Sequence, residues 1–235
     1  MITSKDNEEV KYINKLRKSS FRDEEGIFIV EGFHLVDEAY KRGLLLKVIS
    51  TKEETYNVPH LIVSERILKH LSNLMSPSII GLVKIKENTS IEGNLILALD
   101  NIQDPGNLGT ILRSAKAFNV KTILLSQGSV SLYNDKVIRS GQGLIFDLNI
   151  IRCNLEEMIK RLGFKVLITD VEGGSDINDY KLNERSILVM GSEGRGVSEK
   201  IKKLKDEALY IKMNKDCESL NVAVAASIIM HHLGG

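Results

Sequence analysis

The chain has 235 residues, of which 43% are hydrophobic and 27% charged, and its formal net charge is only +1. This composition supplies enough apolar side chains for buried cores and excludes a disordered chain, and the length favours two domains. No apolar run approaches the roughly 20 residues of a membrane span. The polar, acidic start MITSKDNEEV is unlike a signal peptide, so we expect a cytoplasmic protein.

The first predicted element is a helix with a basic face. Residues 11–22, KYINKLRKSSFR, contain five basic residues and no acidic one. On a continuous helix, four cations would fall on one side and could contact RNA phosphates; these are Lys11, Lys15, Lys18 and Arg22. A solvated helix face explains the same pattern equally well, so charge alone leaves both interpretations open.

Short strands and helices alternate over residues 26–86. Strands are expected at GIFIVEG, LLLKVIS, HLIVS and IIGLVKIK, and helices at FHLVDEAYKRG and ERILKHLSNL. The polar segment KENTSIEGN, residues 86–94, then interrupts the apolar pattern and is the best linker candidate. We therefore expect a compact α/β domain over residues 1–90 and a second domain over residues 91–235.

Continuous apolar runs dominate the second part of the chain. They are LILALD (95–100), TILLS (122–126), KVLITD (165–170), SILVMG (186–191) and ALYIKM (208–213). Such runs are typical of parallel strands that are buried on both faces. Helical stretches such as EEMIKRLG separate them, and this spacing predicts a parallel α/β sheet.

The first informative loop leaves the strand at 95–100, where DNIQDPGNLGTILRSAKAFNV turns into a helix. Asn107 suits the N-cap of that helix. A turn before a helix favours anions, but the segment has neither GxGxxG nor GxxxxGK[ST], so the common nucleotide-binding fingerprints are absent. From this segment alone, Arg113 reads as a surface arginine.

Two further loops follow apolar strands. VMGSEGRGVS (189–198) places three glycines around Glu193, whose carboxylate could bond a ribose hydroxyl, order the loop or cap the next helix. YIKMNKDCESLNVAVAASIIMHHL (210–233) passes through a polar loop into a helix of small residues, for which Ser219 suits the N-cap. That helix could pack in a core or at a subunit interface.

Cysteine and histidine spacing argues against a metal site. Cys153 and Cys217 form no short-range pair, and the five histidines show no HExxH spacing. We therefore expect no bound metal.

Together, the three loops resemble the three motifs of the SpoU (TrmH-like) family of RNA 2′-O-ribose methyltransferases in the SPOUT superfamily. The matching segments are DPGNLGTILRSA, MGSEGRG, and IKM followed by ESLNVAVA, and KVIRSGQG also resembles a family segment. VKYINKLRK with GIFIVEGFHLVDEA is similar to the L30e-like RNA-binding domain, related to a large-subunit ribosomal protein, that precedes many members.

The resemblance implies a parallel SPOUT sheet with a C-terminal trefoil knot, a homodimer that completes each site, and S-adenosylmethionine as cofactor. Gly191, Ile211 and Leu220 match the cofactor positions, where glycine allows close approach of backbone and ligand. The positions expected near the reacting ribose are matched by Asn107, Arg113, Glu193, Ser219 and Asn221.

The implied reaction transfers a methyl group to a ribose 2′-hydroxyl of RNA, and the two-domain arrangement favours ribosomal over transfer RNA. Because a sulfonium methyl is already activated, the protein must mainly align the ribose oxygen and disperse its proton. A guanidinium pKa above about 12 disfavours Arg113 as the base and favours it as a phosphate anchor or a stabiliser of the developing alkoxide.

Three positions depart from the family pattern. Lys212 stands where members often have proline, and Lys215 where they often have glycine, which could loosen the cofactor loop. Asn119 replaces a frequent glycine, but asparagine tolerates the left-handed conformation. Lys212 and Lys215 leave one alternative, a non-catalytic RNA-binding protein that retains the fold. A transfer RNA 2′-O-methyltransferase is the other alternative.

Overall fold

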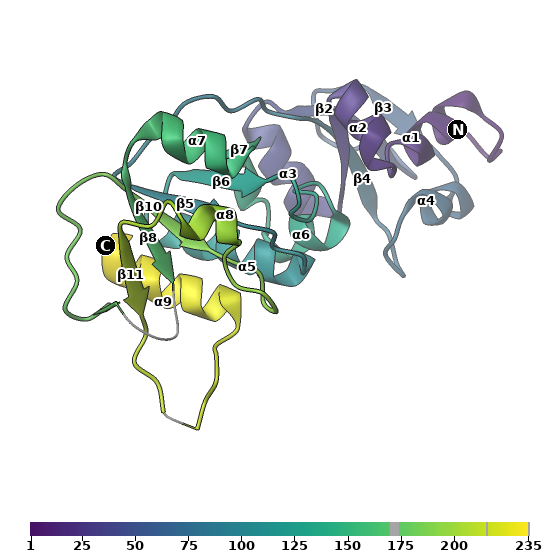
Figure 1. Cartoon of the computed structure of the whole chain (residues 1–235). Helices are drawn as coiled ribbons and strands as arrows, with labels where there is room; N and C mark the ends of the chain where they lie inside the picture. The colour runs from purple at the N-terminus through teal and green to yellow at the C-terminus, as the bar shows by residue number, and fades with distance from the viewer. Residues whose placement is uncertain (170–173, 215, 235) are drawn as a thin grey trace. The chain divides into compact units, whose positions relative to one another are not determined.

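The computed structural model describes residues 1–169, 174–214 and 216–234 of the chain. It divides into two compact units, Met1–Lys86 and Glu87–Gly235 (Figure 1). None of the helices in the described ranges has the length and apolar character to cross a membrane.

The first unit is a mixed four-stranded sheet with helices packed on it. The strand order is β1-β4-β2-β3, in which β4 is antiparallel to both neighbours and β2 is parallel to β3. Its elements are α1 (Glu8–Lys15), α2 (Ser19–Glu25), β1 (Ile27–Glu31), α3 (Phe33–Lys41), β2 (Leu45–Ser50), β3 (His60–Ile62), α4 (Glu65–Leu71) and β4 (Ile79–Lys84). The alternation predicted after residue 26 is therefore present.

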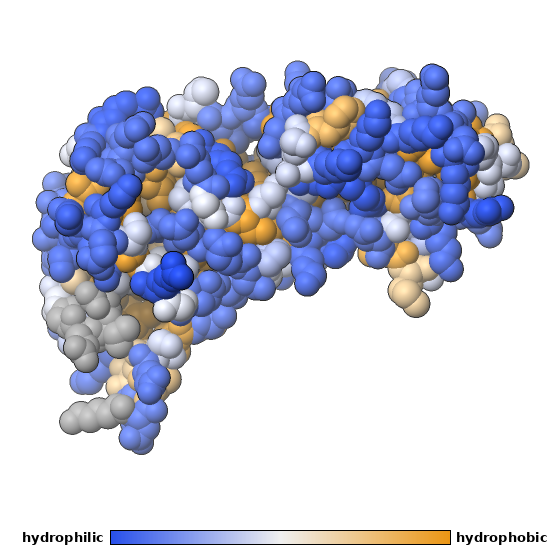
Figure 2. Space-filling view, turned by 45° about the vertical axis from the view of Figure 1, so that its right-hand side comes forward, coloured by the Kyte–Doolittle hydropathy of each residue, from blue (hydrophilic) through white to orange (hydrophobic). Residues whose placement is uncertain are grey.

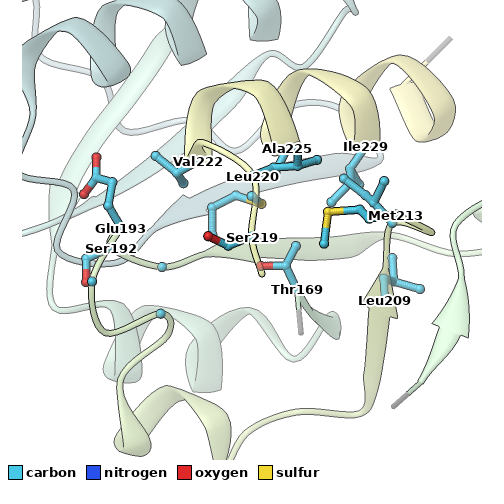
Figure 3. Close-up of a pocket in the computed structure, with 15 residues that line it drawn as sticks. Thr169, Ser192, Glu193, Leu209, Met213, Ser219, Leu220, Val222, Ala225 and Ile229 are labelled. Atoms are coloured by element: carbon cyan, nitrogen blue, oxygen red, sulfur yellow. The ribbon is translucent and has the colours of Figure 1, made fainter. Parts of the chain in front are cut away.

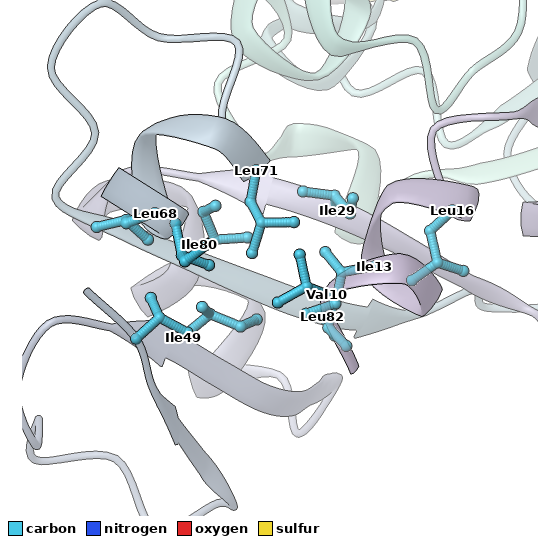
Figure 4. Packing of buried hydrophobic residues seen from close by; sticks show 11 residues of the cluster. Val10, Ile13, Leu16, Ile29, Ile49, Leu68, Leu71, Ile80 and Leu82 are labelled. Carbon is cyan, nitrogen blue, oxygen red and sulfur yellow. The ribbon is translucent and has the colours of Figure 1, made fainter. Parts of the chain in front are cut away.

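The core of this unit lies between the sheet and helices α1 and α4 (Figure 4). Val10 and Ile13 recur at helical spacing on α1 and are fully buried. Helix α3 packs on the opposite face, where Gly81 of β4 makes room for it. A Cβ at Gly81 would lie only 3.1 Å from the Val36 side chain and 2.9 Å from that of Leu45.

The continuous basic helix predicted over residues 11–22 is wrong. Helix α1 ends at Lys15 and α2 begins at Ser19, so the cations do not share one helix face. Arg22 is buried, and its guanidinium donates to the main-chain oxygens of Leu16 and Arg17 at 3.5 and 3.1 Å. Arg22 therefore closes the turn between the two helices and does not face a ligand.

The second unit contains a seven-stranded sheet of order β7-β6-β5-β10-β8-β11-β9, and every described neighbouring pair is parallel. This confirms the predicted parallel sheet, to which β7 and β9 are additions. Strands β5, β6 and β10 are buried at every position, which explains their continuous apolar runs. The strands are β5 (Leu95–Leu99), β6 (Thr122–Ser126), β7 (Asn149–Cys153), β8 (Lys165–Thr169), β9 (Ser175–Asp176), β10 (Ser186–Met190) and β11 (Glu207–Tyr210).

Helices cover both faces of this sheet. On one face, α7 (Leu155–Leu162) and α8 (Glu199–Lys202) contribute Ile159 and Ile201 to a buried cluster with the strands. On the other lie α5 (Pro105–Ala117), α6 (Asp135–Ser140), the short 3-10 helix η1 (Leu144–Phe146) and α9 (Val222–Gly234). Gly109 permits close packing of α5 on α6, because a Cβ there would lie 1.8 Å from Ser140 Oγ.

The polar segment predicted as a linker has no helix or strand, but much of it is bound to the second unit. The main-chain N–H and oxygen of Glu92 both bond the Thr122 hydroxyl at 2.8 Å, and Asn149 donates to the Glu92 carboxylate at 3.0 Å. Arg185 donates to the main-chain oxygens of Ile91 and Gly93 at 3.3 and 3.2 Å. Residues 91–94 are thus fixed beside the amino ends of the strands.

Hydrophilic residues cover most of the face seen in Figure 2, and apolar residues appear there as small, separate patches. In the second unit, the large apolar side chains that are clearly exposed among the described residues are Val224 (46%) and Ile228 (37%). They lie one turn apart on α9, so this helix presents an apolar strip to its surroundings.

Candidate active site

The three loops singled out in the sequence meet at the carboxyl edge of the parallel sheet, where open α/β sheets usually bind ligands. The first loop follows β5 and enters α5. Oδ1 of Asp104 accepts from the Asn107 main-chain N–H at 2.8 Å, so Asp104 is the N-cap and the prediction of Asn107 as cap was wrong. The Asn107 side chain instead points to the other two loops.

A chain of hydrogen bonds joins the three loops through Asn107. Its Nδ2 donates to Oε1 of Glu193 at 2.5 Å, and its Oδ1 accepts from Nδ2 of Asn221 at 3.0 Å. Oδ1 of Asn221 accepts in turn from the main-chain N–H groups of Ala223 and Val224 at 2.9 and 3.3 Å. A carboxylate at one end and main-chain donors at the other are consistent with only one orientation of both amides.

These bonds also correct the predicted start of the last helix. Asn221 caps α9, whereas Ser219 lies two residues earlier in an exposed loop. The prediction of Ser219 as N-cap was therefore wrong. Glu193 likewise does not cap α8, whose N-cap residue is Ser198.

The loop after β10 is closed by its own backbone. Ser192 and Gly196 exchange main-chain hydrogen bonds of 3.1 and 2.9 Å, and Gly196 adopts a φ of 63°. A Cβ at Gly191 would lie 2.0 Å from the carbonyl carbon of Gly196 and 2.1 Å from the nitrogen of Val197. Glycine is therefore required at 191 by the loop itself, in addition to any approach of a ligand.

Asp100, at the carboxyl end of β5, holds the same loop and was missed from the sequence. Its side chain is 4% exposed; Oδ2 accepts from the Ser198 N–H and Oδ1 from Asn101 Nδ2, both at 2.8 Å. The available signal was an acid directly after the apolar run LILAL. A buried carboxylate in that position needs donors, and the neighbouring loop supplies one.

A pocket that is open to solvent lies between these loops. Gly191, Ile211 and Leu220 all line it, as do Glu193 and Ser219. Figure 3 shows side chains of α9 on one wall and residues of β11 and its following loop on another. The remaining lining residues are Thr169, Met190, Ser192, Gly194, Gly196, Leu209, Met213, Val222, Ala225 and Ile229.

The lining fits S-adenosylmethionine better than a nucleoside polyphosphate. Its walls are apolar side chains such as Leu209, Val222 and Ile229, which suit a flat heterocycle. Among the described residues, no lysine or arginine lines the pocket, whereas the carboxylate of Glu193 does. Phosphates would be disfavoured there, and a sulfonium, which is a cation without phosphate, would not.

Arg113 lies apart from the pocket. It is exposed on α5, and within the described ranges its side chain has no hydrogen-bond or ion-pair partner. Its neighbour Ser114 meets Ser227 of α9 with 2.6 Å between the hydroxyl oxygens, so the backbone of Arg113 lies beside α9. The structure thus groups Asn107, Glu193 and Asn221, and leaves Arg113 on a surface.

Lys212 and Lys215 are the two lysines that depart from the family pattern. Lys212 is exposed, while Ile211 and Met213 on either side of it line the pocket. Lys212 itself is not among the residues that line the pocket. Lys215 lies outside the described residues.

Comparisons with known proteins show which family the chain resembles. A model described as SpoU rRNA Methylase family matches residues 94–231, and one described as MRM3-like substrate binding domain matches residues 7–81. The 23S rRNA (guanosine(2553)-2′-O)-methyltransferase RlmP of Bacillus subtilis is 34% identical to the chain, with 100% of this chain and 99% of the relative covered.

Solved structures resemble the chain over both units. The crystal structure of an AdoMet-bound rRNA methyltransferase from Sinorhizobium meliloti superposes with a TM-score of 0.88 at 26% identity, covering 98% of this chain and 95% of that one. A TrmH-family RNA methyltransferase from Porphyromonas gingivalis gives a TM-score of 0.84 at 27% identity, with 94% and 95% covered.

Proposed function

We propose a role for each site residue in the reaction of this family. The chain belongs to the SpoU rRNA methylase family and transfers a methyl group from S-adenosylmethionine to a ribose 2′-hydroxyl of ribosomal RNA. The observation that supports these roles is the pair of hydrogen bonds that links Glu193, Asn107 and Asn221, of which Glu193 lines the pocket. It joins one residue from each of the three loops.

We infer that Gly191, Ile211 and Leu220 hold the cofactor, since all three line the pocket. When bound, the cofactor supplies a methyl group activated by a sulfonium. The apolar walls would hold its adenine ring, and the main-chain groups of the loop closed by Ser192 and Gly196 would bind its polar parts.

Asn107 and Asn221 orient the carboxylate that receives the ribose. Because Oε1 of Glu193 is engaged by Asn107, Oε2 remains to accept a hydrogen bond from a ribose hydroxyl. Ser219 is exposed and lines the same pocket, where it offers a hydroxyl as a further hydrogen-bonding group. These groups align the attacking oxygen, which is the main requirement of a reaction with an activated methyl group.

We propose that the enzyme is a homodimer in which Arg113 acts on the site of the partner subunit. The apolar strip of Val224 and Ile228 on α9 supports a subunit interface, and Arg113 stands on the neighbouring helix without a partner among the described residues. There its guanidinium would bind a phosphate or stabilise the alkoxide.

We also propose that the chain forms the trefoil knot of its family. Strand β11 lies near one edge of the sheet, whereas α9, which follows it, returns to pack on α5 after β5. The bond between Asn221 and Asn107 fastens this returning segment beside the first loop.

Ribosomal RNA of the large subunit is the substrate to test first, because the relative RlmP modifies 23S rRNA. Purified enzyme would be incubated with methyl-labelled S-adenosylmethionine and deproteinised ribosomal RNA from cells that lack the gene. We expect label in a single 2′-O-methylnucleotide by mass spectrometry, and none with Asn107→Ala. Label on a base would overturn the proposed chemistry, and label only on transfer RNA the substrate.

A further inference from the structure

A second group of cations follows the pocket loop directly. Residues 195–205, RGVSEKIKKLK, contain five basic residues and one acidic residue, although the whole chain has a net charge of only +1. The segment comprises the end of the loop that carries Glu193, helix α8 and the turn after it. Any RNA that reaches Glu193 therefore comes close to this segment.

The segment is fixed to the sheet, so its cations have defined positions. Val197 and Ile201 are each 3% exposed and belong to the buried cluster beneath α7 and α8. Ser198 is held by the carboxylate of Asp100. With this inner face buried, Lys200 and Lys203 are left on the exposed side of α8.

Among the described residues, Lys200 and Lys203 form no ion pair with a carboxylate. Lys202 pairs with Glu199 at 2.9 Å, and Lys160 of α7 pairs with Glu156 at 2.6 Å. The hydrogen bond from Lys160 is the main cause that lowers the pKa of Glu156, and the charges of Lys200 and Lys203 lower it further. One carboxylate thus lies among three ammonium groups, and the surface keeps a positive excess.

The basic stretch of the first unit is less suited to phosphates than its sequence suggests. Arg22 is buried against main-chain oxygens, and Arg17 bonds Glu31 at 2.9 Å. Lys11 lies 3.6 Å from Asp6. The cations that remain exposed there do not form the single stripe that the sequence predicted.

We propose that the exposed side of α8 and its flanking turns binds RNA backbone phosphates next to the reacting nucleotide, through Arg195, Lys200, Lys203 and Lys205. The proposal rests on the function given above and adds a substrate surface to it. Phosphates are the partner because the surface is cationic, fixed and continuous in sequence with the loop of Glu193. The catalytic unit would then itself supply RNA-binding energy.

The test compares two double variants that lose the same charge. Lys200→Gln/Lys203→Gln removes two cations from the proposed surface, and Lys121→Gln/Lys181→Gln removes two exposed lysines elsewhere in the second unit. Binding to deproteinised ribosomal RNA would be measured by filter retention across a series of salt concentrations. We expect the α8 variant to bind roughly tenfold more weakly and its salt slope to fall by about 1.4, at about 0.7 for each lost contact with single-stranded RNA.

The control variant should retain the wild-type slope, and both variants should bind S-adenosylmethionine as wild type does. A wild-type affinity and slope for the α8 variant, or an equal loss in the control, would overturn the proposal. A wild-type enzyme that binds RNA but transfers no methyl group in single turnover would instead contradict the proposed function, so the two failures are distinguishable.

Discussion

Asn107 and Asn221 lie 114 positions apart in the sequence, yet Nδ2 of Asn221 donates to Oδ1 of Asn107 over 3.0 Å. This bond links the loop before α9 to the first turn of α5. Asn107 also donates to the carboxylate of Glu193, so the three side chains form one hydrogen-bonded network. A substitution at any of the three side chains should therefore alter the orientation of the other two.

Asn221 offers a way to separate capping from orientation. Asn221→Asp keeps an oxygen that can accept from the N–H groups of Ala223 and Val224, but it cannot donate to Asn107. We expect a wild-type melting temperature and a loss of methyl transfer of at least tenfold in single turnover. Asn221→Ala should lose transfer equally and also about 1 kcal/mol of stability, which is the usual cost of an absent cap. Full activity of Asn221→Asp would show that the amide donor has no role.

Asp100 should control cofactor affinity without touching the cofactor. Both of its oxygens accept hydrogen bonds, so Asp100→Asn loses one acceptor and sets two donors against each other. We expect the dissociation constant for S-adenosylmethionine to rise about tenfold, as titration calorimetry would detect, because an unmade buried hydrogen bond costs about 1–3 kcal/mol. Asp206→Asn is the matched control, since its amide oxygen can keep the bond from the Val166 N–H. Equal affinities for the two variants would remove Asp100 from the site.

Filling the pocket should exclude the cofactor. Gly191→Val is unsuited to this test because its new Cβ would strike the backbone of Gly196 and so disturb the loop itself. Ala225, on the pocket wall of α9, can instead be enlarged to leucine. Ala225→Leu should keep the fold by circular dichroism and weaken S-adenosylmethionine binding by at least tenfold, whereas Ala225→Ser should bind nearly as wild type. Wild-type affinity for Ala225→Leu would place the cofactor elsewhere.

Arg113→Ala should abolish methyl transfer while the affinity for S-adenosylmethionine stays unchanged, because Arg113 does not line the pocket of its own subunit. Arg113→Lys keeps the charge but loses the planar fork, so rescue by lysine would indicate charge stabilisation and no rescue would indicate bidentate anchoring.

Mixed dimers test whether Arg113 acts across the interface. Subunits carrying Arg113→Ala would be mixed with subunits carrying Glu193→Gln, each inactive alone. If each site takes Glu193 from one subunit and Arg113 from the other, one of the two sites in a mixed dimer is intact, and about a quarter of the wild-type rate should return. No recovery would mean that both residues act within one subunit.

Local patterns predicted the strands well because a parallel strand buried on both faces has to be apolar at each position. LILAL, TILLS and SILVM are the clearest cases, and all are strands. Asn119, expected to tolerate a left-handed conformation, indeed has a φ of 58°. What failed were assignments that depend on how the chain folds around the residue. Arg22 looked like a surface cation, but the oxygens that bury it are supplied by the turn at Leu16 and Arg17.

At the site, too, some features could be predicted from the sequence and others depend on the folded structure. Motif order indicated which loops carry the site. The cap of α5 was placed three residues too late and that of α9 two residues too early, because Asp104 and Asn221 have neighbours that suit a cap equally well. No periodicity could reveal that Asn107 reaches Glu193, 86 positions further along. The role of Asp100 depends on Ser198, which only the folded sheet brings near it.

The pocket draws its walls from β8, the loop after β10, the end of β11 and the first turns of α9. During synthesis, the first unit and strands β5 to β10 can emerge and begin to fold before Leu220, Val222 and Ala225 have been made. If the pocket holds S-adenosylmethionine as proposed, a nascent chain retains the cofactor only after these residues have left the ribosome. On that proposal, cofactor binding occurs late in biogenesis and stabilises only chains in which α9 has docked.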